Sequence, residues 1–435
     1  MNSGSAVRRA GLAVGVSLLL VSMGGPAAQA QAPGGNSGDG TVAAALATAP
    51  VPGGFATWSD LMGMQNKLNT AAEKIRQAAA ASGRSGYASV IAAPENRELL
   101  VYWQGEVPAA VQRVIGEQNR SVPVRVLPAR YNQEQLLAEV RRLGENDAVG
   151  EVAPRADGSG LDVRWAKGRS RAQGLAAENL LATATVDVRV DTAAGEVETT
   201  PFAGKCADGA SWCREDDAPA YYAGARTMNC TVGWPMHYQA ATRLLSAAHC
   251  ADLNQVIFDG GGDRMGPVIN DSQRQDTMII DARGAGRMWD GGWQNSTYTK
   301  PIAGASFSNV GNWLCTSGAS SGVLCGIQVK ANNLEVGTAY PLVRAEQVNH
   351  TSAAGHGDSG GPVFELTSAN SKVIAKGTIS AGDVQAKVRC TGEIWQEREC
   401  AWRIYYADTT QALARYRAVI VVDGPQQGLT ADVKK

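Results

Sequence analysis

This chain of 435 residues lacks a surplus of charge of one sign, since it contains 40 Lys and Arg residues and 41 Asp and Glu residues. Nothing in this balance favours a nucleic acid or an anionic membrane as a partner. Beyond residue 30 the sequence also lacks an apolar run that could cross a bilayer, which requires about 20 residues. The chain is long enough for two or three folding units.

The first 30 residues have the three parts of a signal peptide. Arg8 and Arg9 supply the positive start, residues 10–21 are apolar, and Ala28-Gln29-Ala30 offers small residues for cleavage. The apolar run is too short for a transmembrane anchor. The arginine pair also occurs in twin-arginine signals, but the rest of that pattern is missing. We therefore expect a secreted, extracellular protein without a membrane partner.

Cysteine is absent from the first 205 residues, and the eight cysteines that follow are an even number. In a secreted chain this predicts four disulfides, although eight cysteines allow 105 pairings. No C-x-x-C pair occurs, so the cysteines give no indication of a metal site. We expect no metal and no other cofactor.

Histidine is scarce, and the positions of its residues decide between two interpretations of one serine motif. The stretch 357–362 reads Gly-Asp-Ser-Gly-Gly-Pro, in which glycines surround Ser359. A G-x-S-x-G motif is also the nucleophile elbow of α/β-hydrolases, whose catalytic histidine follows the serine. No histidine follows Ser359, since the four are His237, His249, His350 and His356. The α/β-hydrolase order is therefore excluded.

The remaining order has a histidine and then an acid before the serine. His249 lies in the stretch Leu-Ser-Ala-Ala-His-Cys at 245–250. A serine hydroxyl is a weak nucleophile until an imidazole accepts its proton. Asp276 directly precedes a short apolar run, which suits a carboxylate at the mouth of a buried strand. We favour Asp276 as the acid over its rivals Asp271 and Asp281.

With these motifs, residues 225–420 resemble the chymotrypsin family of secreted serine peptidases, in the bacterial branch that includes streptogrisins and α-lytic protease. The resemblance implies an endopeptidase that hydrolyses polypeptides through an acyl-enzyme intermediate. It implies His249 as general base, Asp276 as its orienting carboxylate and Ser359 as nucleophile. The backbone N–H groups of Gly357 and Ser359 are implied as the oxyanion hole. The alternative is a catalytically silent binding protein on the same scaffold.

The disulfide pairs follow in part from the same resemblance. It implies two of them, Cys230–Cys250 and Cys315–Cys325. Elimination and proximity leave two more, Cys206–Cys213 and Cys390–Cys400.

One position departs from the family pattern. The bacterial relatives use an arginine after the counterpart of Cys315 to neutralise the aspartate before the nucleophile, and Thr316 stands there in this chain. An unpaired buried carboxylate on Asp358 would be strongly destabilising. We expect either another arginine or an amino terminus freed by proteolysis to pair with it.

Specificity is expected from a pocket below the serine. By analogy with the family, Ala353 and Ala354 occupy its base, where trypsin-like members carry an acid for Arg or Lys. We therefore expect an uncharged pocket for apolar or aromatic side chains. Ser380 and Gly382 belong to the segment that pairs with the substrate backbone, and Gly382 would leave the pocket open. The alternative is a preference for small residues, if a tyrosine of the pair 405–406 fills the pocket.

The pattern along the chain predicts an N-terminal α+β segment. Residues 31–54 form a linker rich in Gly, Ala and Pro, and residues 55–190 alternate between helical and strand patterns. The expected helices are 57–82, 107–117, 132–143 and 170–181, and the expected strands are 88–93, 99–103, 123–127, 161–165 and 183–190. We interpret 55–190 as a removable pro-region that assists folding and inhibits the enzyme from within the chain. The alternative is a permanent N-terminal domain.

Residues 191–229 are expected to contain the maturation cut, near 190–205. Short apolar runs between turn residues predict an all-β peptidase domain over 230–423, a double six-stranded antiparallel β-barrel of the chymotrypsin type. Apolar positions at helical spacing predict a C-terminal helix over 409–420, and a polar tail covers 424–435. We expect the protein to be a monomer.

Overall fold

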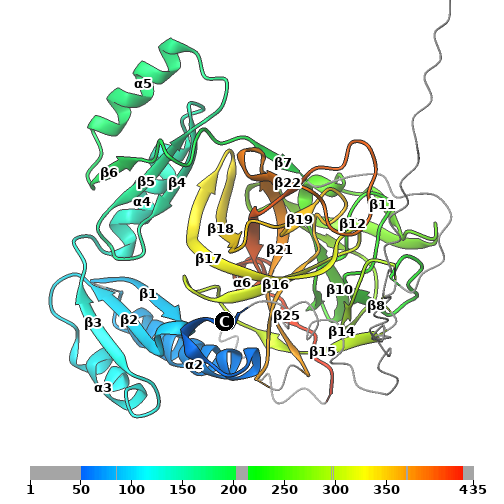
Figure 1. The fold of residues 1–435 in the computed structure, drawn as a ribbon, viewed down its shortest axis with the longest axis horizontal. Helices are drawn as coiled ribbons and strands as arrows, with labels where there is room; N and C mark the ends of the chain where they lie inside the picture. Colours follow the sequence, from blue (N-terminus) through cyan, green and yellow to red (C-terminus); the bar gives the residue numbers. More distant parts are fainter. Residues whose placement is uncertain are drawn as a thin grey trace, which may run out of the picture. The chain divides into compact units, whose positions relative to one another are not determined.

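The computed structural model describes residues 50–84, 86–201, 214–294, 296, 298–368 and 371–424. The expected signal peptide, most of the linker and nearly all of the C-terminal tail lie outside these residues. An α/β region is followed by a half built almost entirely of β-strands (Figure 1). Among the described helices, none has the length and apolarity that a membrane span requires.

The first long helix, α2 (Trp58–Ala81), begins at a capping box. The Thr57 side chain accepts a hydrogen bond from the Asp60 backbone N–H, and the Asp60 side chain accepts one from the Thr57 backbone N–H. One face of the helix is apolar and buried, with Leu68 and Ile75 fully shielded from solvent. The predicted helix over 57–82 is confirmed, because its apolar spacing and its cap agree.

Two βαβ units follow, each with a helix between parallel strands. The first places α3 (Ala109–Gln118) between strands that pair in parallel, β2 (Glu98–Trp103) and β3 (Val124–Pro128), while β1 (Tyr87–Ala93) pairs antiparallel with β2. The second unit comprises α4 (Gln133–Gly144), β4 (Val149–Pro154), β5 (Leu161–Trp165), α5 (Arg171–Ala182) and β6 (Val188–Val190). Strands β5 and β6 pair in parallel.

Two expectations for this region need correction. Strand β4 was not expected from the sequence, because it is nearly continuously buried and residues 149–154 show no strict alternation of apolar and polar side chains. The strand expected over 183–190 is only three residues long, since Thr183 ends helix α5 and strand pairing begins at Val188.

In the β-rich half, one antiparallel sheet has six strands in the order β11-β12-β13-β10-β9-β25. Their bounds are β9 (Pro235–Tyr238), β10 (Ala241–Ser246), β11 (Val256–Phe258), β12 (Arg264–Ser272), β13 (Thr277–Ile280) and β25 (Val419–Ile420). Buried apolar side chains such as Leu244, Val268 and Ile280 form its core. This sheet corresponds to the first predicted barrel.

Six other strands close into a ring in which each pairs antiparallel with its two neighbours, in the order β16-β17-β18-β24-β21-β20. Their bounds are β16 (Trp313–Gly318), β17 (Gly322–Val336), β18 (Ala339–Gln347), β20 (Pro362–Leu366), β21 (Val373–Asp383) and β24 (Arg403–Asp408). A closed ring leaves no free strand edge along the paired residues. It matches the second predicted barrel.

Further strands extend this ring into a sheet of thirteen strands. They include β8 (Tyr221–Ala223), β14 (Gly284–Asp290), β15 (Tyr298–Ala305) and β7 (Thr199–Pro201). Strand β4 of the α/β region pairs with β17, with Val152 opposite Glu335. A separate small sheet consists of β19 (Ala354–Gly355), β22 (Lys387–Val388) and β23 (Cys400–Ala401). The described chain is therefore mixed in secondary structure rather than all-β.

The C-terminal helix is shorter than expected. Helix α6 (Thr409–Tyr416) is capped by Asp408, whose side chain accepts from the Thr410 and Gln411 backbone N–H groups. It ends at Arg417, which adopts a left-handed conformation with φ of 51°. The chain then forms β25, which pairs with β9. The apolar residues after Tyr416 thus complete a sheet instead of continuing the helix.

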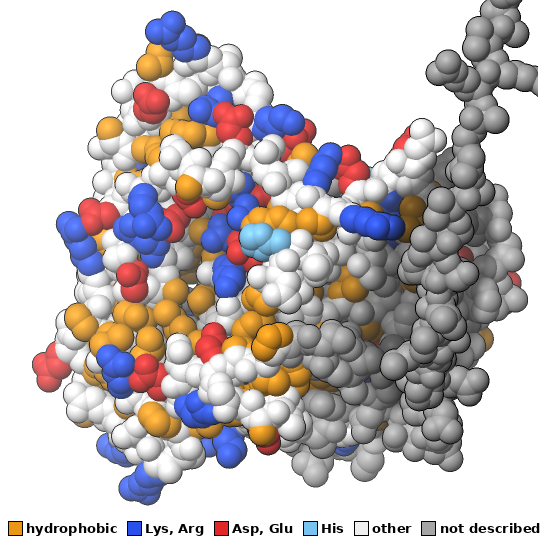
Figure 2. Space-filling view, viewed as in Figure 1, with side chains coloured by type: hydrophobic (Ala, Val, Ile, Leu, Met, Phe, Trp, Pro, Cys, Tyr) orange, Lys and Arg blue, Asp and Glu red, His pale blue; other side chains and the backbone are white. Residues whose placement is uncertain are grey.

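Charged side chains of both signs are interspersed on the face drawn in Figure 2. The pattern agrees with the formal net charge of −1. It gives no single-sign field that would attract a polyanion or a polycation.

Helix α2 shares a core with the β-rich half. Trp58, Leu61 and Met62 belong to one buried cluster with Trp313 and Phe364, and the rings of Trp58 and Trp313 meet edge to face at 5.5 Å. Aromatic burial of this kind is among the largest single contributions to a core. The α/β region therefore completes the packing of the β-rich half in the full chain.

Beside this apolar cluster lies a buried ion pair that helix α2 also contacts. Lys376 Nζ lies 2.8 Å from Glu365 Oε2, and neither side chain has more than 1% of its surface exposed. Gln65 Nε2 and Asn69 Nδ2 donate to the same carboxylate at 3.0 and 2.9 Å. The amides of α2 thus supply hydrogen bonds that a buried ion pair requires.

We predict that Lys376→Met destabilises the full-length protein by about 3–5 kcal/mol, because Glu365 would remain buried without a cation. Urea unfolding followed by tryptophan fluorescence would measure the change. Lys372 is exposed and directly precedes β21, the strand that carries Lys376. Lys372→Met should change the free energy of unfolding by less than about 0.5 kcal/mol. Adding Glu365→Gln to Lys376→Met should recover part of the loss. Equal effects of the two lysine substitutions would contradict this prediction.

Candidate active site

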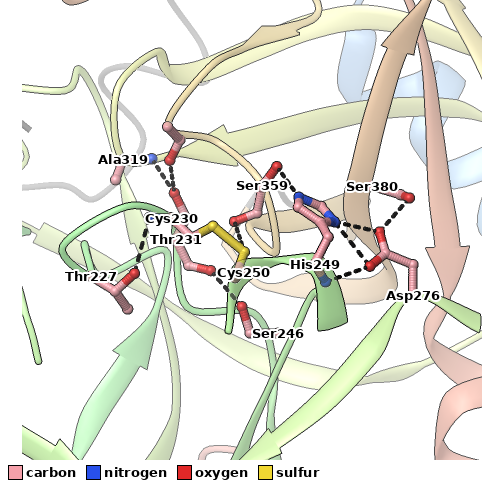
Figure 3. The surroundings of a disulfide bond; sticks show 11 residues. Thr227, Cys230, Thr231, Ser246, His249, Cys250, Asp276, Ala319, Ser359 and Ser380 are labelled. Carbon is pink, nitrogen blue, oxygen red and sulfur yellow. Dashed lines mark hydrogen bonds and ion pairs between the residues drawn. A yellow bond between two sulfur atoms is a disulfide. The ribbon is translucent and has the colours of Figure 1, made fainter. Parts of the chain in front are cut away.

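The loop after strand β10 carries His249. A short turn, η3 (Ala248–Cys250), positions the imidazole directly beside a disulfide between Cys230 and Cys250, with an S–S distance of 2.07 Å (Figure 3). The disulfide ties the histidine turn to the segment that precedes β9. A covalent link across 20 residues restricts the loop on which His249 sits.

Three of the predicted site residues form one line of hydrogen bonds (Figure 3). His249 Nε2 lies 2.8 Å from Ser359 Oγ, and His249 Nδ1 lies 2.8 and 2.9 Å from the two carboxylate oxygens of Asp276. The His249 backbone N–H also donates to Asp276 Oδ1 at 3.0 Å. Ser380 Oγ donates to Asp276 Oδ2 at 2.5 Å. The line fixes the tautomer in which Nδ1 carries the proton and Nε2 faces the serine.

Asp276 occupies a turn at the start of strand β13. It follows the short helix η4 (Gln273–Gln275) and has a left-handed backbone with φ of 49°, which turns its carboxylate back toward the histidine. Only 7% of the residue is exposed. Burial alone would raise the pKa of this carboxyl, but the charge of His249 and the hydrogen bonds from His249 and Ser380 leave the pKa below its usual value. Asp276 is therefore charged at neutral pH.

The two rival acids lie elsewhere. Asp281 forms an ion pair with Arg243 at 2.7 Å, and Asp271 accepts a hydrogen bond from Gln273 Nε2 at 2.9 Å. Of the three candidates that the sequence offered, the structure brings Asp276 to the histidine.

The serine turn depends on two glycines. Gly357 and Gly360 have positive φ values of 91° and 78°, and a Cβ atom on either would lie 2.1 Å from a serine hydroxyl, that of Ser320 or of Ser246 respectively. No larger residue fits at these positions without displacing a neighbour. Among the described residues, no carbonyl accepts a hydrogen bond from the backbone N–H of Gly357 or Ser359. These two donors are thus available to a ligand, as an oxyanion hole requires.

Asp358, the residue before the serine, is completely buried and has several partners. Its carboxylate accepts hydrogen bonds from the backbone N–H groups of Ser321 at 2.9 Å and Gly355 at 2.8 Å, and from Ser321 Oγ at 2.5 Å. Arg398 Nη2 lies 3.3 Å from Asp358 Oδ2. Of the two expected partners of Asp358, another arginine or a freed amino terminus, the structure shows an arginine, Arg398. The carboxylate of Asp358 is thus paired in the full chain.

Arg398 is itself held by the loop that the Cys390–Cys400 disulfide closes. Its guanidinium donates to the carbonyls of Thr391 at 2.8 Å and Glu393 at 2.7 Å, and to His356 at 3.0 Å. Sequence reasoning missed this residue. The sequence indicated it only through its position between Cys390 and Cys400, which are 10 residues apart.

Three of the four expected disulfides are present in the described residues: Cys230–Cys250, Cys315–Cys325 and Cys390–Cys400. The fourth expected pair, Cys206–Cys213, lies outside them. The close approach of Cys230, His249 and Cys250 resembles a metal-binding group, but both sulfurs are bonded to each other and cannot act as thiolate ligands.

The residues expected at the substrate pocket are buried in the full chain. Ala353 and Ala354 have no exposed surface, and the Ala353 carbonyl accepts a hydrogen bond from Thr316 Oγ1 at 2.7 Å. Ser380 and Gly382 both lie on β21, two residues apart. No charged side chain is among the residues that the sequence analysis assigned to the pocket.

Strand β7 runs antiparallel along the end of β21. Pro201 lies opposite Ala381, Thr200 opposite Gly382 and Thr199 opposite Asp383. Ala381 and Gly382, in the segment that the resemblance assigns to substrate backbone pairing, are thus paired with the chain's own residues. Ser359 has no exposed surface in this arrangement.

A buried network of charges lies beside this strand pairing. Arg164 Nη1, from β5, lies 2.9 Å from Glu151 Oε2 and 2.9 Å from Asp383 Oδ2. The Tyr405 hydroxyl donates to Glu151 at 2.9 Å, and Arg403 contacts Asp383 at 2.9 Å. The α/β region therefore contributes one acid and one base to a network that the β-rich half cannot complete by itself.

The other histidines lie apart from this line of hydrogen bonds. His350 stacks on the Trp402 ring at 4.0 Å, and His237 is on strand β9. Burial lowers the pKa of His356, so its imidazole is mostly neutral at pH 7.

No protein-family model and no curated protein matches this sequence. Solved structures do match over 46% of the chain. One is a glutamic acid specific serine protease described as using a histidine triad in substrate binding, with 22% identity, 96% of its own chain covered and a TM-score of 0.33. Two others are Thermobifida fusca Protease A, with 17% identity, 98% coverage and a TM-score of 0.35, and an α-lytic protease homologue, with 16%, 98% and 0.32.

We predict that Arg398→Met destabilises the protein by about 3–5 kcal/mol, because Asp358 would lose the arginine that pairs with it while remaining buried. Arg389→Met is the matched control, since Arg389 is exposed at the edge of the same disulfide loop. Thermal unfolding of both variants and the parent would measure the difference. An Arg398→Met protein as stable as the control would show that the hydrogen bonds to Asp358 suffice without the arginine.

Proposed function

We propose that this chain is a secreted serine endopeptidase made with an N-terminal pro-region. The observation that carries the proposal is the continuous line of hydrogen bonds from Asp276 through His249 to Ser359, next to two free backbone N–H donors. A nucleophile, a base, an orienting acid and an oxyanion site are the parts that acyl transfer requires. The expected signal peptide and the disulfides support an extracellular site of action.

The proposed reaction proceeds in two halves. Ser359 Oγ attacks the peptide carbonyl while His249 Nε2 accepts the hydroxyl proton, and the backbone N–H groups of Gly357 and Ser359 hold the oxyanion. His249 then donates this proton to the leaving amine, which leaves an acyl group on Ser359. Water attacks the acyl group while His249 accepts its proton, and the acid product departs as the proton returns to Ser359. Asp276 stabilises the imidazolium at each stage.

We further propose an uncharged specificity pocket that accepts apolar or aromatic side chains. Ala353 and Ala354 at its base carry no charge, so an arginine or lysine side chain would find no counter-ion there. The hydroxyl of Tyr405 is bonded to Glu151 and Arg164, which argues against a pocket filled by this ring. Tyr406 shares a buried cluster with Ala353 and Ala354, so a pocket filled by Tyr406, with a preference for small residues, stays the alternative.

The same proposal assigns residues 55–190 to inhibition and to assisted folding. Strand β7 (Thr199–Pro201) follows this region, within the segment expected to contain the maturation cut, and it occupies the β21 residues that would pair with a substrate backbone. Its position supports inhibition by the N-terminal part of the chain. The packing of Trp58, Leu61 and Met62 against the β-rich half supports the second, because it supplies core residues during folding. A cut beyond β7, within the expected range 190–205, would remove the region and this strand together and so free the substrate strand.

We predict that a fluorophosphonate probe labels Ser359 in the processed, secreted protein. His249→Ala should slow labelling by a factor on the order of 10⁶, since the serine loses its base. His237→Ala should label at the parent rate, because this histidine lies on strand β9 and does not contact the serine. Peptide mass spectrometry would locate the adduct. Failure to label a processed and folded protein would favour the silent binding protein over the enzyme.

We predict that maturation occurs after Phe202. Strand β7 ends at Pro201, opposite Ala381, which follows Ser380, the partner of Asp276. Phe202 is the next residue in the sequence. An aromatic residue there also fits the proposed pocket. N-terminal sequencing of the mature protein should begin at Ala203.

Two substitutions test this cut. Phe202→Tyr should mature at the same bond, because the pocket would still receive an aromatic ring. Phe202→Asp should stop or displace the cut, since a carboxylate would enter an uncharged pocket. A mature chain that begins elsewhere, or Phe202→Asp protein that matures normally, would refute the assignment.

A further inference from the structure

Three aspartates from two separate segments meet near the turn between β11 and β12. Asp259 and Asp263 lie at the two ends of this turn, and Asp216 belongs to the acidic run Glu215-Asp216-Asp217. One carboxylate oxygen from each of the three lies within 4.8 Å of the others. Like charges this close repel strongly unless a cation or protons separate them.

The turn itself is built to bring these segments together. Gly260, Gly261 and Gly262 connect the two aspartates. A Cβ atom on Gly261 would lie 2.4 Å from Asp216 Oδ1, and one on Gly260 would lie 2.7 Å from the Glu215 carbonyl oxygen. Gly262 has a φ of 94°, which side-chain-bearing residues rarely adopt. The glycines thus allow the acidic run to lie directly on the turn.

Asp259 is the residue that points to a ligand. It has no exposed surface, and its Oδ1 accepts a hydrogen bond from the Asp263 backbone N–H at 2.7 Å. Its Oδ2 has no hydrogen-bond partner within the part of the chain that the structure describes. Burial and the neighbouring charges of Asp263 and Asp216 raise the pKa of Asp259.

No basic side chain among the described residues compensates this cluster. Arg214 directly precedes the acidic run, but its guanidinium donates to the carbonyls of Gly224 and Gly318 and to Ser317 Oγ. Arg226 forms ion pairs with Glu215 and Glu393. None of the three aspartates forms an ion pair with a described Lys, Arg or His. A buried carboxylate without a cation or a full set of donors is strongly unfavourable.

We propose that Asp216, Asp259 and Asp263 form a binding site for a hard divalent cation, Ca²⁺. Carboxylate oxygens are the ligands that Ca²⁺ prefers, and its six to eight positions can be completed by backbone carbonyls and water. Carboxylates that converge from an exposed loop and a tight turn suit its flexible coordination better than the strict octahedron of Mg²⁺. The site does not depend on the proposed peptidase activity.

The cation would hold a specific piece of chain in place. If maturation occurs where we expect, residues 214–217 lie close to the new amino terminus, and the metal would fasten them to the β11–β12 turn. On the same side, Thr227 pairs with Asp259 across an isolated bridge and accepts from the Cys230 backbone N–H at 3.0 Å. Cys230 is bonded to Cys250, the neighbour of His249. The site is thus connected to the histidine loop through two short contacts.

The test uses the full-length chain carrying Ser359→Ala, so that self-digestion cannot obscure unfolding. After EDTA treatment and dialysis, 1 mM Ca²⁺ should raise Tm by about 5 °C, as expected for a site occupied well above its Kd. Terbium(III) should bind to the same protein, with luminescence sensitised by a nearby aromatic ring, and Ca²⁺ should displace it.

Variants then locate the site. Asp259→Asn and Asp263→Asn should each abolish the calcium-dependent rise in Tm, whereas Asp252→Asn, at an exposed position before β11, should retain it. Asp216→Asn changes an exposed side chain of the same cluster and should also abolish the calcium-dependent rise in Tm. This variant tests the site if a substitution in the turn prevents folding. Absence of a calcium-dependent shift in the parent, or an equal shift in Asp259→Asn, would overturn the proposal and leave Asp259 as a protonated buried acid.

Discussion

The buried carboxylate of Asp358 is the constraint on which the candidate site depends. Donors from three separate segments converge on it: the backbone at Gly355, the Ser320–Ser321 turn, and the guanidinium of Arg398. A carboxylate that accepts several hydrogen bonds in a low-dielectric site has little freedom to reorient. Since Ser359 is the next residue, this anchoring also fixes the direction of the serine hydroxyl and of the free N–H groups on either side. The glycines at 357 and 360 then permit the backbone to approach its neighbours closely enough.

Local sequence patterns predicted much of this molecule, and contacts between distant segments account for most of what they missed. The apolar spacing of α2 and the motifs around His249 and Ser359 act over a few residues, so they are visible in the sequence. Arg398 is different, because it lies in a disulfide loop and contacts Asp358, which is 40 residues away in the sequence. The acidic cluster likewise unites segments that are more than 40 residues apart, and no spacing rule connects them. The end of α6 was misjudged for a related reason, since residues 419–420 find a strand partner in β9.

The α/β region and the β-rich half are joined by two kinds of contact with different consequences. Around Trp58 the contact is apolar, and burial of such surface favours association whatever the exact geometry. Around Arg164 it is ionic and buried, and the Arg164–Asp383 pair joins the two halves, while Arg164–Glu151 and Arg403–Asp383 each lie within one half. Apolar burial provides most of the driving force, whereas the ionic network penalises any misaligned docking. The register of β7 on β21 can be set in this way, because Asp383 takes part in both the network and the strand pairing.

Strand β21 explains why one segment can serve the fold and a ligand at once. Its first part pairs with β20, up to Thr378, and with β15 at 373–375, while β24 pairs with Gly377–Gly382. At Ala381–Asp383 the β20 side is no longer occupied by the barrel, and β7 adds there instead. An open strand edge attracts any extended chain with free backbone groups. The full chain covers this edge with its own residues, next to a serine that has no exposed surface, and the same backbone donors and acceptors would become available to a polypeptide once β7 leaves. If the proposed function holds, shielding of the edge and recognition of a substrate would be two uses of one set of hydrogen bonds, and geometry would allow only one of them at a time.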